Sequence, residues 1–379
     1  MIYADNAATT RISDNVIDRM LPFLREQYGN ASSQYSLGAR ARHAVELALN
    51  QAAAAIGAEP LEITFTSGGS EANSWVLRCV SDAYREEPIH IITSAVEHHS
   101  VLNACHALER RGVEITYLRV DTTGRVSAAD VEAAVKPYTR LVSIMLANNE
   151  TGTIEPIAEI GQLLRAKKIL FHTDAVQAVG HIPVDVNDLQ VDFLTASAHK
   201  FNGAKGTGIL YKRSGSELSP LVFGGEQEHG LRSGTENVAG IVAAGCAIEE
   251  NIGEMAEVAK RLNKMVGNTI MGIREKIPSV RINGSNEYRL PGTANLGFDG
   301  ISANSLMHLL DLKGICVSTG SACTSGRDEP SHVLLAMGLT KQQAKSAIRI
   351  SYGKYNRIDD VDAVVEATYS AYAKMKASR

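Results

Sequence analysis

The chain has 379 residues, of which 44% are hydrophobic and 21% are charged, and its formal net charge is −4. This composition excludes a largely disordered chain and favours a soluble globular protein of about two domains. The slight acidic excess argues against a direct nucleic-acid partner, because such proteins normally carry a basic surface.

The sequence also lacks the usual signals for export or membrane insertion. The N-terminus has no basic start followed by an apolar core, and no apolar run approaches the ~20 residues of a membrane helix. The five cysteines include no CxxC pair, which argues against a disulfide framework and a structural metal site. We therefore expect a cytoplasmic protein with no bound metal and no membrane contact.

Short β-rich runs alternate with helical patterns over the first 220 residues, which predicts an α/β fold with a mostly parallel sheet of the seven-stranded type. The predicted strands are 62–66, 90–94, 113–120, 141–146, 169–172, 193–196 and 208–211. The helices predicted between them, which would flank the sheet, are 70–84, 99–111, 128–136 and 157–167.

Beyond residue 224 the pattern changes and predicts a smaller α+β domain. A long helix is predicted over 237–264. It is followed by strands at 279–282, 293–298, 315–318 and 347–351 and by helices at 302–313, 341–346 and 358–376. We place the domain boundary inside the long helix. Residues 15–254 then form the large domain, and residues 1–14 and 255–379 form the small one.

Two segments that follow predicted strands carry groups suited to binding a charged ring and its phosphate. Ligands of open α/β sheets bind at the carboxyl ends of strands. The glycine-rich turn at 66–73 opens a helix, so its free amides and hydroxyls suit a phosphate, although a capped helix start explains the same pattern. Asp174 ends an apolar strand, where a carboxylate pairs with a cationic ring nitrogen or caps the next helix.

Two further segments carry nucleophiles. Lys200 follows the predicted strand 193–196, and a desolvated lysine there can form a Schiff base, whereas a surface lysine would only be solvated. Cys323 lies among small residues at 318–326, a composition that predicts an accessible loop, with an incidental thiol as the alternative. The other cysteines lie in helical or strand patterns and are expected in the core, at Cys79, Cys105, Cys246 and Cys316. Together, the four segments are the parts of a pyridoxal-phosphate enzyme with an added nucleophile.

With these motifs in view, the sequence resembles the cysteine desulfurases of the pyridoxal-phosphate-dependent aminotransferase superfamily, fold type I, in the class that supplies sulfur for iron–sulfur clusters. The matching motifs span essentially the whole chain. They are YADNAATT at 3–10, SGGSEAN at 67–73, VEHHS at 96–100, NNETG at 148–152, HTDAVQ at 172–177, SAHK at 197–200, RSGTENV at 232–238, GSACTSG at 320–326 and IRISYG at 348–353.

The resemblance implies a role for each matching residue. Lys200 holds the cofactor covalently and moves the α-proton, His98 stacks on the cofactor ring and shuttles protons, and Cys323 is the nucleophile. The other cofactor contacts are Asp174 to the ring nitrogen, Gln177 to the phenolic oxygen, and Gly69, Ser70, Ser197, His199 and, from a partner subunit, Thr235 to the phosphate, with Asn149 also in the set. Asn149 and Arg349 hold the substrate carboxylate.

The implied reaction converts L-cysteine to L-alanine and leaves a persulfide on Cys323. A homodimer is expected, as is delivery of the sulfur to a protein acceptor such as an iron–sulfur scaffold or to another thio-cofactor pathway. The alternatives are a selenocysteine lyase, a cysteine/cystine lyase, a plain aminotransferase and, outside enzymes, a catalytically silent paralogue that acts as an assembly partner.

Overall fold

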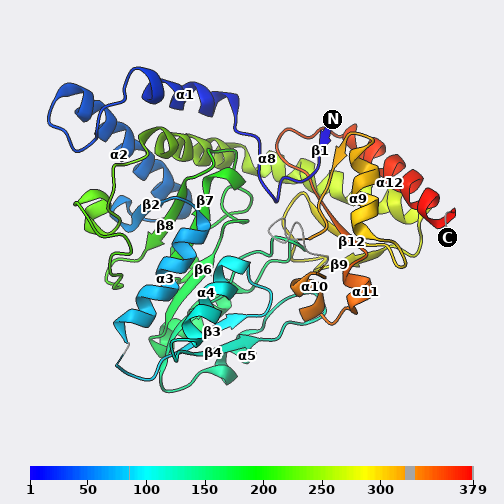
Figure 1. The fold of residues 1–379 in the computed structure, drawn as a ribbon, viewed down its shortest axis with the longest axis horizontal. Coiled ribbons are helices and arrows are strands. Elements are labelled where there is room, and N and C mark those ends of the chain that lie inside the picture. The colour runs from blue at the N-terminus through cyan, green and yellow to red at the C-terminus, as the bar shows by residue number, and fades with distance from the viewer. Residues whose placement is uncertain (85, 321–328, 378–379) are drawn as a thin grey trace.

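The computed structural model describes residues 1–84, 86–320 and 329–377, and it contains a central seven-stranded sheet with the order β2-β8-β7-β6-β5-β3-β4 (Figure 1). The strands are β2 (Ile63–Thr66), β3 (His90–Ser94), β4 (Glu114–Leu118), β5 (Thr139–Ser143), β6 (Leu170–Asp174), β7 (Phe193–Ser197) and β8 (Gly208–Lys212). Strands β3 to β7 pair in parallel, and β8 is antiparallel to both β7 and β2. The predicted mostly parallel α/β sheet is confirmed.

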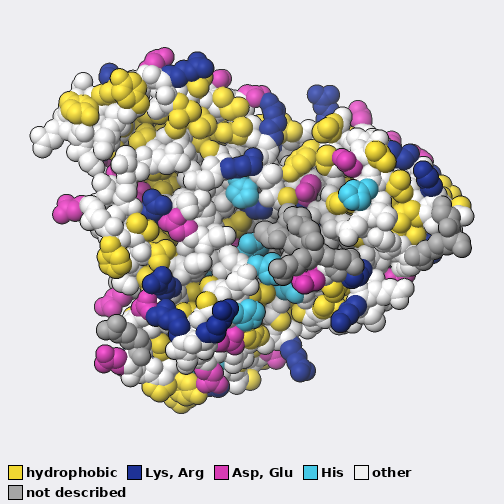
Figure 2. All heavy atoms as spheres, in the orientation of Figure 1, with side chains coloured by type: hydrophobic (Ala, Val, Ile, Leu, Met, Phe, Trp, Pro, Cys, Tyr) yellow, Lys and Arg dark blue, Asp and Glu magenta, His cyan; other side chains and the backbone are white. Residues whose placement is uncertain are grey.

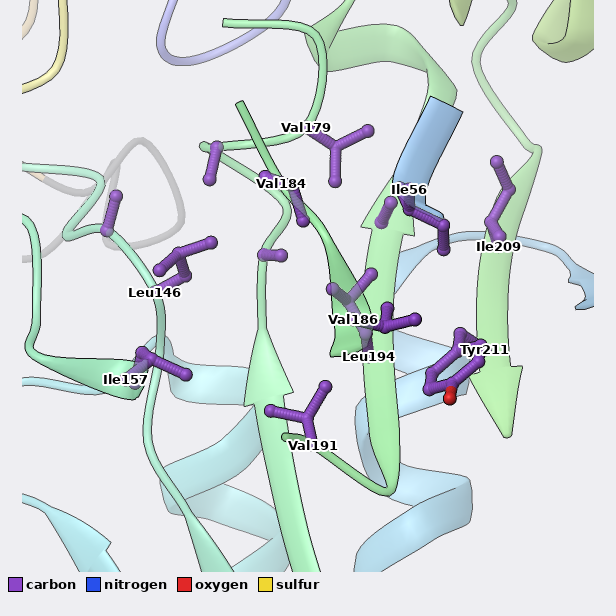
Figure 3. Close-up of a cluster of buried hydrophobic side chains, with 14 of the residues drawn as sticks. Ile56, Leu146, Ile157, Val179, Val184, Val186, Val191, Leu194, Ile209 and Tyr211 are labelled. Carbon is purple, nitrogen blue, oxygen red and sulfur yellow. The ribbon is translucent and has the colours of Figure 1, made fainter. Parts of the chain in front are cut away.

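Helices cover both faces of this sheet because neighbouring residues on each strand point to opposite sides. Ile91 and Phe193 join the cluster that includes α3 and α4, whereas Ile92 and Leu194 join the cluster that includes α2, α6 and α8. Figure 3 shows part of the second cluster, where Leu194 lies near other aliphatic side chains. The helices of the first 276 residues are α1 (Asp14–Arg25), α2 (Ser36–Ile56), α3 (Gly69–Ala83), α4 (His99–Glu109), α5 (Ala128–Ala134), α6 (Ile157–Lys167), α7 (Val186–Leu189) and α8 (Val238–Lys276).

The rest of the chain forms a second region around a three-stranded sheet with the order β12-β10-β9. Its elements are β9 (Arg281–Asn283), β10 (Thr293–Gly297), α9 (Ala303–Asp311), β11 (Ile315–Cys316), α10 (His332–Ala336), α11 (Lys341–Ala344), β12 (Ala347–Ser351) and α12 (Asp360–Ala377). The N-terminal strand β1 (Ile2–Tyr3) pairs in parallel with β11, so the start of the chain lies in the same region as its C-terminal part (Figure 1).

Helix α8 contributes to two separate apolar clusters. Its residues up to Ile248 pack with the large sheet, whereas its buried residues from Leu262 onward pack with β10, β12 and α12. The change from one cluster to the other falls within the long helix, on either side of residue 255. The division into domains at that residue remains a prediction.

Several element boundaries differ from the sequence prediction. Helices α1 and α2 occupy a stretch in which no element was predicted, and α8 continues to Lys276 instead of ending at 264. The glycines at 267 and 272 weaken the helical signal there, but Met265 and Ile273 lie buried on one face and stabilise the added turns. A Cβ on Gly272 would lie 3.1 Å from the Val365 side chain of α12, so the glycine allows the two helices a close approach.

Candidate active site

A cavity of about 220 Å³ lies at the carboxyl ends of β6 and β7. Its lining includes residues from both ends of the chain as well as from the large sheet. The predicted site residues that line it are Gly69, Ser70, His98, Asn149, Asp174, Gln177, Ser197, His199, Lys200 and Arg349. The fold therefore brings together residues that are up to 280 positions apart in the sequence.

Lys200 ends the short helix η2 (Ala198–Lys200), which follows β7 directly. Its ammonium group donates hydrogen bonds to the carbonyl oxygens of Ala7 and Ala8, over 2.6 and 2.7 Å. The Gln177 amide also donates to the Ala7 carbonyl, over 2.9 Å. The N-terminal segment thus forms one wall of the cavity. This segment carries the motif YADNAATT, for which the sequence predicted no contact.

Asp174 is the last residue of β6, and its buried carboxylate is held from two sides. The Asn73 side-chain amide donates to Oδ2 over 2.6 Å, and the Val176 backbone N–H donates to Oδ1 over 3.0 Å. The bond to Val176 opens a series of turns at residues 176–181, where the capping interpretation expected a helix. The bond to Asn73 was not anticipated from the sequence, and it fixes the plane of the carboxylate beside the cavity.

The start of α3 has the features of an anion site. Gly68 precedes it with φ 154° and ψ 176°, a conformation that is essentially confined to glycine. No side chain of the described residues caps this helix, so its first amides are available to a ligand. A Cβ on Gly69 would lie 2.7 Å from the Val176 methyl Cγ2, so only a glycine fits there. This geometry favours the phosphate interpretation over a simple capped helix start.

Two histidines of the cavity wall have lowered pKa values. His98 is the N-cap residue of α4, and its Nδ1 accepts the Ser100 backbone N–H over 3.1 Å. Burial lowers the pKa of His98. The pKa of His199 is lowered to about 4, first by burial and then by Lys200 and Lys205, while its Nδ1 lies 3.1 Å from the Thr9 hydroxyl. Both rings therefore stay neutral near neutral pH.

Arg349, on β12, brings a buried guanidinium to the side of the cavity opposite the large sheet. Its Nη1 donates to the Asn149 carbonyl over 2.7 Å, and its Nη2 donates to Asp5 Oδ1 over 2.6 Å. Among the described residues, no acceptor pairs with its buried Nε. A guanidinium held on two sides with an unused N–H suits recognition of a carboxylate.

Two predicted site residues are not placed in this cavity. Thr235 is exposed and does not line the cavity of its own chain. Cys323 lies outside the described residues. Of the other cysteines, Cys79 and Cys105 are buried as expected, but Cys246 and Cys316 are only half-buried, which corrects the expectation of a core position for them.

Asn73 and Ser100 are the polar lining residues that sequence reasoning missed; the remaining missed lining residues are Ala7, Ala8, Met145 and Val176. Both polar residues lie inside the motifs named above. A hydroxyl or amide in the first turns of a helix commonly hydrogen-bonds to the nearby backbone, so neither residue was distinguishable as a binding residue from the sequence. Within the described ranges, no group of three or more His, Cys, Asp or Glu could hold a metal ion. No helix in those ranges is long and apolar enough to span a membrane.

These residues fit a ligand that combines a phosphate, a basic ring nitrogen and a carbonyl group. The uncapped start of α3 suits the phosphate, Asp174 suits the nitrogen, and the Lys200 amine suits the carbonyl.

Comparison with known proteins agrees with this chemistry. The profile of the aminotransferase class-V family matches residues 2–364. The cysteine desulfurase IscS of Methanosarcina thermophila is 46% identical over 375 residues, which is 99% of this chain and 93% of that protein.

Solved structures agree as well. A NifS-like protein is 39% identical with a TM-score of 0.93 and covers 98% of this chain and 99% of its own. A structure described as SspA in complex with cysteine is 35% identical with a TM-score of 0.83, over 94% of this chain and all of that one. The chain belongs to the class-V aminotransferases and, within that family, to the cysteine desulfurases.

Proposed function

We propose that this protein binds pyridoxal 5'-phosphate in the cavity and removes the sulfur of L-cysteine, releasing L-alanine and holding the sulfur as a persulfide on Cys323. The observation that carries the proposal is the meeting of the Lys200 amine, the Asp174 carboxylate and the Arg349 guanidinium around one cavity. Pyridoxal 5'-phosphate, when bound, supplies an electron sink that weakens the bonds at the α- and β-carbons of an amino acid.

The residues of the large sheet would hold the cofactor. Asp174 would pair with the ring nitrogen, and Gln177 would contact the phenolic oxygen. The phosphate would take hydrogen bonds from the start of α3 and from the serine and histidine that precede Lys200; these residues are Gly69, Ser70, Ser197 and His199. Lys200 would bind the cofactor covalently and then move the substrate α-proton, and His98 would lie against the ring and take part in proton movement.

The opposite wall would bind the substrate. Arg349 and Asn149 would hold the α-carboxylate, because the guanidinium has a buried N–H without an acceptor among the described residues. The SspA structure supports cysteine as the substrate, since that related protein is described in complex with cysteine.

Cys323 would perform the sulfur transfer. Its thiolate would attack the substrate sulfur, so that an S–S bond forms while the Cβ–S bond breaks, and the electron pair of that bond would take up a proton to give the methyl group of alanine. Cys323 is proposed from its sequence motif. The described residues that precede it support the proposal. Ser318, five residues before Cys323, pairs with Arg349 through backbone hydrogen bonds of 3.1 and 2.7 Å. The described chain therefore passes beside the proposed carboxylate site at Ser318.

A homodimer would complete the site. Thr235 of the partner subunit would reach the phosphate, which is consistent with its exposure and its distance from the cavity of its own chain. Figure 2 shows hydrophobic side chains gathered over α1 and α2. Residues of α1, α2 and α8 also line a groove of about 780 Å³. Tyr28 and Phe223 are 72% and 84% exposed, which favours cover by a second copy. Light scattering would give the mass of the assembly in solution.

The persulfide would pass to a protein acceptor in the cytoplasm, and the resemblance of the motifs to desulfurases that supply iron–sulfur clusters makes an iron–sulfur scaffold the first acceptor to test.

The decisive experiment compares wild type with Cys323→Ala after addition of L-cysteine, with alanine and sulfide measured side by side. We expect wild type to form both products in the presence of a thiol reductant and the variant to form almost none. A variant as active as wild type would favour a cysteine or selenocysteine lyase, and a protein that fails to bind pyridoxal phosphate would favour a silent paralogue. Alanine that forms only with added keto acid would indicate an aminotransferase.

A further inference from the structure

Two polar side chains of the cavity wall, Asn73 and Ser100, connect Asp174 with His98. Asn73 lies on α3 and is buried, and its side-chain amide donates to Asp174 Oδ2 over 2.6 Å and to Ser100 Oγ over 2.9 Å. Ser100 lies in the first turn of α4, with its Oγ 2.8 Å from His98 Nδ1. The four side chains form one hydrogen-bonded chain along the cavity.

Two neighbouring groups that can only donate, the Ser100 backbone N–H and the Asn73 side-chain amide, determine which ring nitrogen of His98 accepts hydrogen bonds. The Ser100 backbone N–H donates to Nδ1 over 3.1 Å, so Nδ1 is an acceptor. Because the Asn73 amide donates to Ser100 Oγ, the hydroxyl proton of Ser100 is left for Nδ1 as well. With two donors directed at Nδ1, the ring proton of neutral His98 lies on Nε2.

The position of His98 at a helix end reinforces this state. Its Nδ1 provides the N-cap bond of α4, and a proton on Nδ1 would break that bond and place a cation at the positive end of the helix. Burial acts in the same direction and lowers the pKa of the ring. The neighbouring charges act on the pKa of His98 in opposite directions. Asp174 and Glu150 favour the protonated ring. Lys200, His332 and the adjacent His99 disfavour it.

We propose that Ser100 and Asn73 are positioning residues that hold His98 as the neutral tautomer with its proton on Nε2, so that in the resting enzyme His98 is a hydrogen-bond donor at Nε2 and not a base. The inference rests on the proposed function, in which His98 lies in the reacting cavity. Its consequence is specific: resting His98 cannot take the proton of the Cys323 thiol at Nε2. The Nε2–H group instead donates a hydrogen bond to negative charge that develops in the cavity.

The tautomer can be measured directly on the full chain labelled with ¹⁵N-histidine, with and without pyridoxal phosphate. Nitrogen chemical shifts separate a protonated from an unprotonated ring nitrogen, and the His98 signals are assigned by their loss in His98→Gln. In wild type we expect Nδ1 unprotonated, Nε2 protonated, and a titration midpoint below the ordinary histidine value of about 6.5.

Ser100→Ala removes the hydroxyl donor and leaves the backbone donor. We expect the second tautomer to appear, the His98 midpoint to rise, and kcat to fall about 2- to 10-fold, the loss expected for one hydrogen bond, with KM unchanged. Ser100→Thr keeps the hydroxyl and should restore the wild-type spectrum. Ser302→Ala, which removes the N-cap hydroxyl of α9, is the matched control and should change neither the His98 signals nor kcat.

Two results would overturn the inference: a wild-type His98 with its proton on Nδ1, or identical His98 tautomers and midpoints in wild type and Ser100→Ala. The spectra do not depend on turnover. An inactive protein with the expected tautomer would contradict the proposed function alone, and an active desulfurase with the proton on Nδ1 would contradict this inference alone.

Discussion

The two walls of the cavity are built in different ways. The wall on the large sheet takes Asp174 from the last position of β6 and Lys200 from the end of η2, which follows the neighbouring strand β7. The opposite wall takes carbonyl groups from Ala7 and Ala8 and a guanidinium from Arg349, which lie at opposite ends of the chain. In the proposed function the first wall would hold the cofactor, and the second would bind the substrate and hold the lysine in place.

The largest expected effect comes from the sheet wall. Lys200→Ala removes both the covalent link and the group that moves the α-proton, so we expect activity to fall at least about 10³-fold. The absorbance of bound cofactor above 400 nm should shift or disappear in the same variant. Retention of more than a tenth of the activity would contradict the role of Lys200.

An effect on the opposite wall should appear in substrate binding. Arg349→Lys keeps the charge but loses the planar pair of N–H groups, so we expect KM for L-cysteine to rise about 10- to 100-fold with a smaller change in kcat. Steady-state kinetics over a range of L-cysteine concentrations measure both values. Asp5→Asn is the control, because it breaks the ion pair with Arg349 and leaves the guanidinium in place. An unchanged KM in Arg349→Lys would contradict the carboxylate site.

The proposed phosphate site at the start of α3 can be tested by adding a side chain at Gly69. In Gly69→Ala the new methyl group would lie 2.7 Å from Val176 Cγ2, so we expect the affinity for pyridoxal phosphate to fall about 10-fold. The double variant with Val176→Ala removes the clash and should recover most of the affinity, measured by cofactor titration of the apoprotein. Failure of the second change to recover affinity would show that Val176 does not cause the loss.

A separate expected effect, outside the two walls, concerns stability and its dependence on pH. Burial raises the pKa of Glu155 to about 8 from its ordinary 4.5, because the charged form is disfavoured in the folded protein. The unfolded chain therefore releases this proton first, and Glu155 makes the protein less stable as pH rises from 4.5 to 8. In wild type the unfolding free energy should decrease between pH 5 and pH 8.5, and in Glu155→Gln this decrease should be smaller by about 2–4 kcal/mol. The measurement is the unfolding free energy of both proteins at the two pH values. An equal fall in wild type and variant would contradict the assignment.

The sequence by itself determined the elements of the large sheet and the groups that follow its strands. Strands 90–94 and 193–196 were recognisable because runs of branched and aromatic residues bury both faces of a parallel strand, and this pattern is local. Asp174 and Lys200 were recognisable as candidates because each polar group lies within a few residues of the end of a predicted strand. The roles of Arg349 and His98 came from the resemblance to a family and not from local pattern.

Only the tertiary structure decided how distant segments complete the site. The carbonyl groups of Ala7 and Ala8 carry no side-chain signal, and their approach to Lys200 depends on the pairing of β1 with β11, whose paired residues lie 313 positions apart in the chain. The contacts of Asn73 with Asp174 and Ser100 likewise depend on the packing of α3 against α4 and on the position of β6. Sequence periodicity reports which face of an element is buried, but long-range packing decides which polar groups meet there.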